Sequence, residues 1–124
     1  PLGVAAAHAV LDIIEEEGLC DRAERLGQRL KQRLASLRDD VPEIVDIRGP
    51  GLMNAVEFNV AGSDRPNPEM TNRVREQALE RGLILLTCGV YGNVIRFLPP
   101  LTVPEAVFEE ALGILEDSIR AARG

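Results

Sequence analysis

The amino-acid sequence predicts an α+β domain: a small, mainly antiparallel sheet with helices packed on one side. The first observation is the order of the periodic segments, which is helix, helix, strand, strand, helix, strand, strand, helix. The second is that several connections between the strand-like runs are short. The third is composition and length: hydrophobic residues make up 45% of the sequence, which is enough for one core. A chain of 124 residues is too short for two domains.

The first segment, residues 2–17, predicts a helix that is apolar nearly all round. Such a helix is buried on most sides, which is unexpected for the terminal element of a small domain. The chain also begins Pro1-Leu2-Gly3, without a methionine and without a polar lead-in. We therefore expect this helix to have been covered by a part of a larger protein that the sequence does not contain.

The second segment, Leu19 to about Arg38, is the clearest amphipathic helix. Charged residues fill the faces away from the apolar stripe, and we interpret this charge run as a solvated surface that includes Lys31, the only lysine. The apolar stripe recurs at spacings of three and four and contains Ala23, Leu26, Leu30, Leu34 and Leu37.

Two strands follow, residues 43–48 and 52–60, joined by a tight Gly49-Pro50-Gly51 connection. In the second strand Asn54, Val56 and Phe58 share one face, and Ala55 and Glu57 share the other. The glycine turn is not a dinucleotide-binding motif, because it precedes a strand and lacks the third glycine.

The second half of the sequence repeats the mixture of helix and strand. Residues 69–81 predict a helix, residues 83–86 and 94–98 predict two strands around a loop with Gly89 and Gly92, and residues 102–122 predict the last helix. Thr102-Val103-Pro104-Glu105 has the pattern of a capping box, so we expect this helix to begin at Thr102.

Composition excludes several classes of function. The net charge of −6 argues against a nucleic-acid partner, and no apolar run is long enough for a membrane span. No basic region with a cleavage site stands at the start of the sequence, so we expect no secretory signal. Cys20 and Cys88 form neither a disulfide framework nor a metal-ligand spacing, so no metal is expected and a reducing, cytoplasmic location fits best.

Arg96 is the residue that most needs a functional explanation, because it lies inside an apolar strand between Ile95 and Phe97. If both faces of the sheet are covered, its guanidinium is buried and must meet an anion. One interpretation is a ligand carboxylate, which arginine holds with two hydrogen bonds. The alternative is an internal salt bridge, for example with Glu57. For Arg48 we favour an ordinary ion pair over ligand binding.

Two stretches carry motifs that can be matched together. Residues 46–53 contain a strand with an Arg-Gly-x-Gly turn, and the next strand ends in the acidic Glu57. Residues 82–102 contain Gly-Leu-Ile-Leu-Leu, a Cys-Gly turn, Asn-Val-x-Arg and Pro-Leu-Thr. In this order the sequence resembles the C-terminal part of class III (omega-amino-acid) aminotransferases, and within them it looks most like the 4-aminobutyrate aminotransferases.

The resemblance implies a fold type I enzyme that uses pyridoxal 5'-phosphate (PLP) and acts as a homodimer. It implies that residues 1–17 form the helix that leads out of the N-terminal cofactor domain, which is absent from this sequence. Residues 18–124 would then form the C-terminal small domain. It also implies that Arg96 binds the α-carboxylate of glutamate or 2-oxoglutarate and that the Cys88-Gly89 turn lines the same pocket. The amino donor would be 4-aminobutyrate, 5-aminovalerate or a similar ω-amino acid.

The sequence departs from the family pattern because it contains neither the Schiff-base lysine nor the cofactor-binding residues. Lys31 lies on a charged helix face and cannot replace that lysine. We therefore expect the parent protein to be a transaminase and this chain alone to be inactive, with no catalytic residue of its own. The alternative is a non-catalytic α+β module that binds a small ligand or a partner, with Arg96 in an internal ion pair.

Overall fold

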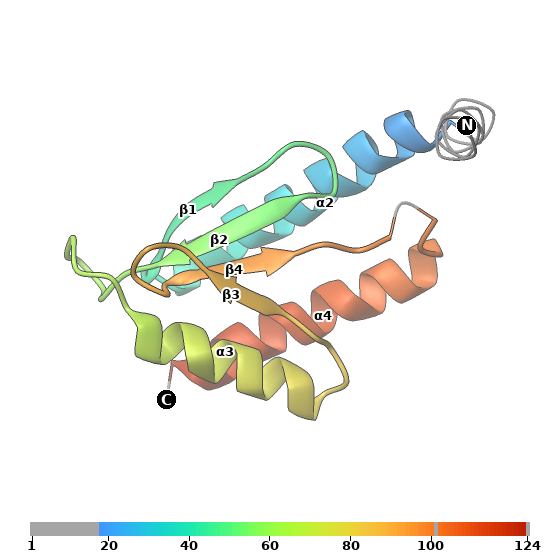
Figure 1. Cartoon of the computed structure of the whole chain (residues 1–124). Coiled ribbons are helices and arrows are strands. Elements are labelled where there is room, and N and C mark those ends of the chain that lie inside the picture. The colour runs from blue at the N-terminus through green and yellow to red at the C-terminus, as the bar shows by residue number, and fades with distance from the viewer. Residues whose placement is uncertain (1–17, 101, 124) are drawn as a thin grey trace, which may run out of the picture.

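The computed structural model describes residues 18–100 and 102–123. The predicted helix over residues 2–17 lies outside the described residues, so the division of the chain at residue 17 stays a prediction. Figure 1 shows the described helices and strands, labelled in chain order from α2. They are α2 (Leu19–Asp40), β1 (Ile44–Arg48), β2 (Asn54–Phe58), α3 (Pro68–Glu80), β3 (Leu86–Cys88), β4 (Val94–Phe97) and α4 (Glu105–Ala122).

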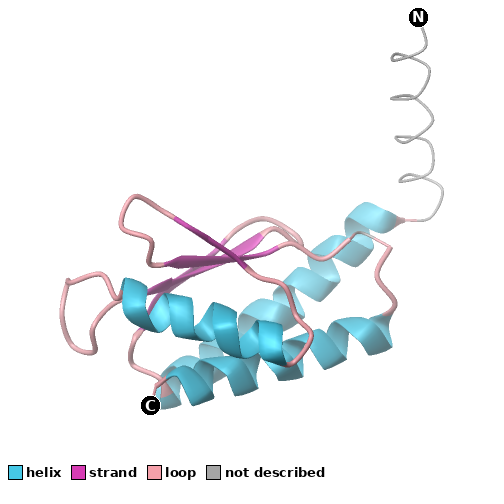
Figure 2. Cartoon of the chain, turned by 60° about the horizontal axis from the view of Figure 1, so that its bottom comes forward, coloured by secondary structure: helices cyan, strands magenta, loops and turns pink. Residues whose placement is uncertain are grey.

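The four described strands form one sheet in the order β1-β2-β4-β3, and every neighbouring pair is antiparallel. Figure 2 shows α3 and α4 below the strands, with α2 running obliquely behind them, and the buried residues of these helices form one cluster with those of the sheet. This confirms the predicted α+β class with an antiparallel sheet and helices on one side. The β2–β4 pairing joins segments that are far apart in the sequence.

The core follows the predicted apolar stripes. The whole stripe of α2, from Ala23 to Leu37, is buried. The inward-facing residues of the sheet are buried as well, with Val56, Phe58 and Ile95 at 1% exposure or less. Helix α4 contributes Phe108, whose ring lies 6.4 Å from that of Phe97. At roughly 25 cal/mol per Å² of apolar surface, this burial supplies the main stabilisation of the domain.

Two elements were predicted to begin three residues too early. The third strand is β3 (Leu86–Cys88) and not residues 83–86. The Leu83 amide instead donates to the Ala78 carbonyl at 2.8 Å and so belongs to the end of α3. The last helix begins at Glu105, with Pro104 as its N-cap and no capping hydrogen bond from a side chain. Helical geometry is disfavoured for a residue that precedes a proline. Val103 precedes Pro104, so it cannot continue a helix begun at Thr102.

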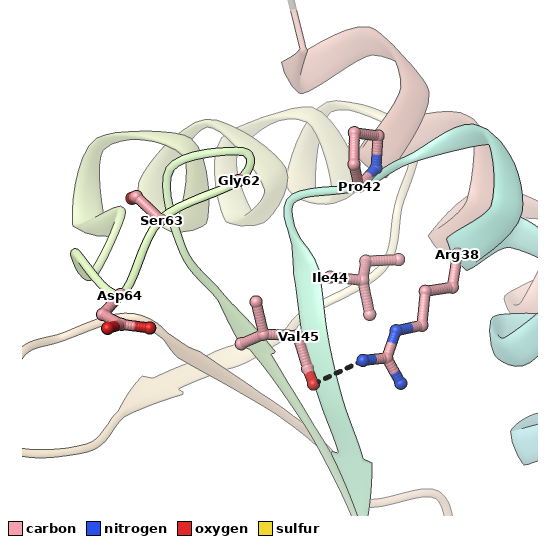
Figure 3. A pocket seen from close by; sticks show the side chains of 7 residues that line it. All are labelled: Arg38, Pro42, Ile44, Val45, Gly62, Ser63 and Asp64. Atoms are coloured by element: carbon pink, nitrogen blue, oxygen red, sulfur yellow. Dashed lines mark hydrogen bonds between the residues drawn. The ribbon is translucent and has the colours of Figure 1, made fainter.

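Strand β1 contains a bulge that the sequence did not indicate. The register with β2 shifts between Ile44 and Asp46, which leaves Val45 outside the regular ladder. Figure 3 shows that Arg38, near the end of α2, donates from Nη2 to the Val45 carbonyl at 2.8 Å. This hydrogen bond satisfies a backbone acceptor that the bulge frees from the sheet.

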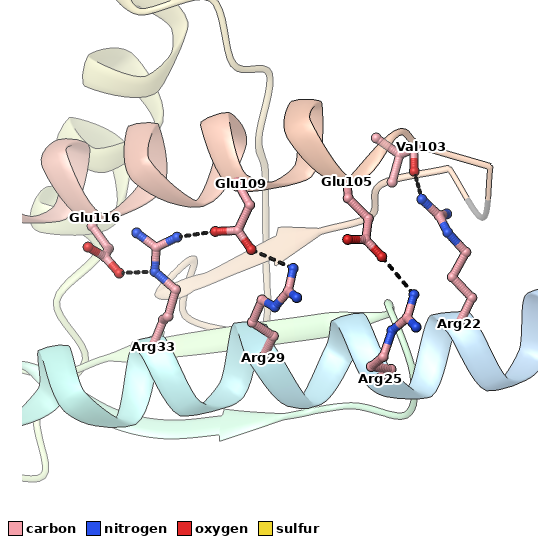
Figure 4. A network of polar contacts seen from close by, with 8 residues as sticks. All are labelled: Arg22, Arg25, Arg29, Arg33, Val103, Glu105, Glu109 and Glu116. Carbon is pink, nitrogen blue, oxygen red and sulfur yellow. Dashed lines mark hydrogen bonds and ion pairs between the residues drawn. The ribbon is translucent and has the colours of Figure 1, made fainter.

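The charged face of α2 is more than the solvated surface that the sequence predicted. Figure 4 shows arginines of α2 paired with glutamates of α4, which runs beside it. Glu109 accepts from Arg29 at 2.6 Å and from Arg33 at 3.0 Å, and Arg33 also donates to Glu116 at 2.7 Å. The hydrogen bond to Glu116 raises the pKa of Arg33 above its usual value.

The same row of pairs continues towards the start of α2. Arg25 donates to Glu105 at 2.7 Å, and Arg22 donates to the backbone carbonyl of Val103. Arginines spaced three and four residues apart share one helix face, so a single face of α2 makes all these contacts. The row therefore joins α2 to α4 and to the segment just before α4.

We predict that Glu109→Gln destabilises the domain modestly, because Glu109 serves two arginines at once. Exposed ion pairs contribute about 0.2–1 kcal/mol each, so a loss of about 0.5–1.5 kcal/mol is expected at low salt. The loss should shrink at about 1 M salt, where the screening length falls to about 3 Å. Urea unfolding at both salt concentrations measures it. Glu110→Gln, at an exposed neighbouring position on α4, is the matched control. Equal losses in the two variants would contradict the assignment.

Candidate functional site

The face of the sheet away from the helices carries a row of side chains from all four strands. Ala55 of β2 lies opposite Arg48 of β1 on one side and opposite Arg96 of β4 on the other. Arg96 in turn lies opposite Leu86 of β3. Neighbouring Cα atoms in such a row are about 4.5–5.5 Å apart. Two arginines therefore flank one small alanine on the face of the sheet that no described element covers.

Arg96 is exposed, although both its neighbours in β4 are buried at 1% and 4%. The predicted alternation of faces is thus confirmed, with Ile95 and Phe97 inward and Arg96 outward. The condition under which the guanidinium would be buried is not met in the described part of the chain. Burial required both faces of the sheet to be covered, and the described helices cover only the inner face.

A pocket of about 290 Å³ opens beside Arg96 on this face. One part of its wall comes from the connection between β1 and β2, and the rest comes from the strands themselves. The small side chain of Ala55 leaves room between the two arginines. The lining residues are Arg48, Gly49, Pro50, Met53, Asn54, Ala55, Arg96 and Leu98.

Arg48 is already neutralised by carboxylates of the same face. Its Nη1 lies 2.8 Å from Asp46 Oδ2 and 3.5 Å from Glu57 Oε1. The hydrogen bond to Asp46 raises the pKa of Arg48 above its usual value. Asp46 and Glu57 lie directly opposite each other in the β1–β2 ladder, so Arg48 bridges two like charges that would otherwise repel. The interpretation of Arg48 as an ordinary ion pair is confirmed.

Arg96 has no such partner. Within residues 18–100 and 102–123 it forms no ion pair and donates no side-chain hydrogen bond. The alternative of an internal salt bridge with Glu57 is wrong for these residues, because Glu57 lies opposite Val94 and its carboxylate faces Arg48. Arg96 therefore presents a guanidinium with unused donors to the pocket and can bind an anion through two parallel hydrogen bonds.

The Cys88-Gly89 turn lies farther along the same face. Cys88 pairs with Val94, two residues from the Leu86–Arg96 pair, so its side chain shares the face of Arg96. Gly89 follows with a positive φ of 90° and packs against Val94, where an added Cβ would meet the side chain at 3.0 Å. Neither residue lines the pocket beside Arg96. Their role in substrate binding stays a prediction.

Asn93, the first residue of the Asn-Val-x-Arg motif, holds strand β4 in place. It is 4% exposed, and its Nδ2 donates to the Phe58 carbonyl at 3.1 Å and to Asn59 Oδ1 at 3.3 Å. The Phe58 amide donates back to the Asn93 carbonyl at 2.8 Å. These bonds fix the register of β4 against β2, and with it the position of Arg96. Sequence reasoning missed this role, because Asn93 directly follows Gly92 and reads as the last residue of a polar loop before the strand.

The described residues do not provide a binding site for PLP. Lys31, the only lysine in the sequence, lies on α2, on the opposite side of the sheet from Arg96, and it does not line the pocket. A covalent bond to the cofactor needs a lysine amine within reach of the substrate. The one lysine of the sequence therefore lies away from the pocket beside Arg96.

A larger hollow, about 390 Å³, lies near the start of β1 and is bordered by the loop around Ser63 (Figure 3). Its cation, Arg38, is engaged by the Val45 carbonyl. Its carboxylate, Asp64, is exposed. Within the described residues no cluster of side chains suitable for a metal ion is found, and no helix there is long and apolar enough to span a membrane. The pocket beside Arg96 is the better candidate site.

Comparison with known proteins agrees with this geometry. The sequence model of the family Aminotransferase class-III matches residues 1–119. A 5-aminovalerate aminotransferase (DavT) of Pseudomonas putida is 44% identical over 117 residues, which are 94% of this chain and 28% of the relative. A 4-aminobutyrate aminotransferase of Mycobacterium leprae is 44% identical over 115 residues, which are 93% of this chain and 26% of the relative.

Solved structures agree as well. A phospholyase from Arthrobacter in complex with phosphoethanolamine superimposes with a TM-score of 0.88 at 30% identity, covering 98% of this chain and 29% of that one. The chain belongs to the class III aminotransferase family, whose members depend on PLP. It spans little more than a quarter of the length of the two relatives described above.

We predict that Arg48→Leu destabilises the domain at neutral pH by about 0.5–1 kcal/mol, since it leaves Asp46 and Glu57 facing each other without a cation. The loss should be smaller at about 1 M salt, where the screening length falls to about 3 Å and the repulsion between the two carboxylates weakens. Urea unfolding at low and high salt measures the difference. Adding Glu57→Gln to Arg48→Leu should restore stability at low salt. A loss that is the same at both salt concentrations would contradict the bridging role.

Proposed function

We propose that this chain is the substrate-side C-terminal part of a PLP-dependent aminotransferase. The enzyme would move the amino group of 4-aminobutyrate, or of a similar ω-amino acid such as 5-aminovalerate, to 2-oxoglutarate. Arg96 would bind the α-carboxylate of 2-oxoglutarate and of the glutamate formed from it. Cys88 and Gly89 would contact the substrate from the far end of the same face. The names of the two relatives support this choice of donors.

The observation that carries the proposal is the contrast between the two arginines beside Ala55. Arg48 is paired with two carboxylates, whereas Arg96 has no partner among the described residues and lines the pocket. A guanidinium without a partner gains most from a bound carboxylate, because none of its existing contacts has to be broken. Its planar fork also fixes the orientation of the carboxylate.

The walls of the pocket suit a short carboxylic acid. Met53 and Leu98 offer apolar surface beside the guanidinium, and Ala55 provides a floor without a bulky side chain. A substrate held here has its carboxylate fixed by Arg96 and its carbon chain directed away from the sheet. The amino-group chemistry itself belongs to PLP, which carries and stabilises the reacting electrons in such enzymes. This chain contributes binding and orientation.

The uncovered face of the sheet favours the presence of a further domain that packs against it. Leu86, Leu98 and Met53 expose 54%, 47% and 59% of their surfaces on or beside this face. We propose that this face packs against the N-terminal cofactor domain, which would close the pocket around Arg96. The enzyme would act as a homodimer, and this chain alone would be inactive because it lacks a lysine in the site. Cys20 and Cys88 are free thiols, in keeping with a cytoplasmic enzyme.

We predict that Arg96→Ala in the complete enzyme weakens the use of 2-oxoglutarate by about 2–4 kcal/mol, equivalent to a rise in KM of about 30- to 1000-fold. The reason is the loss of both hydrogen bonds to the carboxylate. Steady-state kinetics with varied 2-oxoglutarate measures this effect. Arg96→Lys should lie between the wild type and Arg96→Ala, because it keeps the charge and loses the planar fork.

The matched control is Arg75→Ala, which removes an exposed arginine of α3 that does not line the pocket. It should leave the KM for 2-oxoglutarate unchanged. Arg96→Ala should also leave the unfolding midpoint close to that of the wild type, because Arg96 is exposed and unpaired in the described residues. Unchanged kinetics together with a large loss of stability would show that Arg96 is a structural residue and would overturn the proposal.

A further inference from the structure

Gly27 occupies an unusual position in the interior of α2. Glycine is less favourable than alanine inside a helix, and the rest of α2 is rich in good helix formers. The structure supplies a reason for the glycine. A Cβ atom at residue 27 would lie 1.9 Å from the carbonyl oxygen of Gly51 and 2.5 Å from its carbonyl carbon. The backbone of the helix therefore touches the backbone of the turn between β1 and β2.

The Gly51 carbonyl is held from a second direction. Asn54, which is 1% exposed, donates from Nδ2 to this oxygen at 2.8 Å. Gly51 itself has a φ of 52°, in the left-handed region that favours glycine. One carbonyl group is thus held between α2 on one side and β2 on the other, which leaves the turn little freedom to move.

The rest of the turn is packed just as closely. The Met53 amide donates to the Pro50 carbonyl at 3.0 Å. Gly49 has a φ of 130°, and a Cβ there would lie 1.7 Å from the Met53 carbonyl oxygen. Gly49, Pro50, Met53 and Asn54 are half of the residues that line the pocket beside Arg96. The turn that Gly27 contacts through Gly51 therefore carries residues of one wall of that pocket.

Arg96 is positioned by other contacts. It belongs to β4, which is held by its ladders with β2 and β3 and by the side chain of Asn93. Asn54 belongs to the β2–β4 ladder, whereas Gly49 and Pro50 lie outside it. A displacement of the turn would therefore change the gap between these two residues and the guanidinium.

We propose that Gly27 is a positioning residue of the Arg96 pocket, which fixes the Gly49–Pro50 wall at the distance from Arg96 that a substrate carboxylate needs. The inference rests on the proposed function, since it takes the pocket to be the carboxylate site. Gly27 contacts no substrate and acts through the Gly51 carbonyl. Asn54 has the same effect from the other side of that carbonyl.

A methyl group at residue 27 requires a defined movement. The turn would have to retreat by about 1.5 Å to lengthen the 1.9 Å approach to an ordinary contact of 3.4 Å or more. A misplacement of about 1 Å at a binding group can reduce the rate of an enzyme about 100-fold. Because the displaced wall lines the same pocket as Arg96, the group proposed to hold the carboxylate, the loss should fall mainly on the affinity for the oxo acid.

The experiment compares Gly27→Ala with Gly113→Ala in the complete enzyme. Gly113 lies on α4, where an added Cβ would meet no atom within 4 Å, so this variant tests a glycine-to-alanine change without a clash. For Gly27→Ala we expect the KM for 2-oxoglutarate to rise about 10- to 100-fold, with kcat at saturating 2-oxoglutarate within about 3-fold of the wild type. Gly113→Ala should change neither constant.

Asn54→Ala keeps the inference testable if Gly27→Ala does not fold, because it removes the hydrogen bond to Gly51 without adding an atom. It should raise the KM for 2-oxoglutarate and leave kcat largely unchanged. A lower thermal midpoint with an unchanged KM, in whichever of the two variants folds, would overturn the inference. Arg96→Ala in the same assay separates the two proposals. If it raises the KM and the Gly27 and Asn54 variants do not, only the inference fails; if it has no effect, the proposed function fails.

Discussion

The antiparallel pairing of β2 with β4 is the constraint on which the rest of the site depends. It places Ala55 directly beside Arg96 and leaves Glu57 opposite Val94. Asn93 stabilises this register by bonding to the end of β2. A slip of one residue would turn Arg96 into the apolar core, where an unpaired guanidinium costs several kcal/mol or more. The burial of Ile95 and Phe97 on one face of the sheet therefore also places Arg96 on the opposite face.

The two arginines on the open face differ in whether they are paired. Arg48 joins two carboxylates of neighbouring strands, so this part of the face is balanced within itself. Arg96 lies one strand away and stays unpaired among the described residues. On the other side of the sheet, arginines of α2 form ion pairs with glutamates of α4. Of these arginines, only Arg96 both lines the pocket and has no partner for its guanidinium among the described residues.

Most of the fold could be predicted from the sequence, because apolar periodicity decides which face of each element is buried. The stripe of α2 and the alternation along β2 are examples. Contacts between distant backbones could not be predicted, since nothing local marks them: the approach of Gly27 to Gly51 and the bulge at Val45 depend on how the elements pack. For the site, the odd arginine at residue 96 was visible in the sequence. Its exposure was not, because exposure depends on which face of the sheet the helices cover.

We propose that Arg96 binds the carboxylate of the oxo acid in a PLP enzyme. The most direct test follows the absorbance of the bound cofactor in the complete enzyme, first with 4-aminobutyrate alone and then with 2-oxoglutarate added. We expect the spectrum to change with the donor and to return with the oxo acid. We also expect Arg96→Ala to need far more 2-oxoglutarate for the return. A cofactor that responds to neither compound, or a return that is equally sensitive to 2-oxoglutarate in the variant, would contradict this role of Arg96.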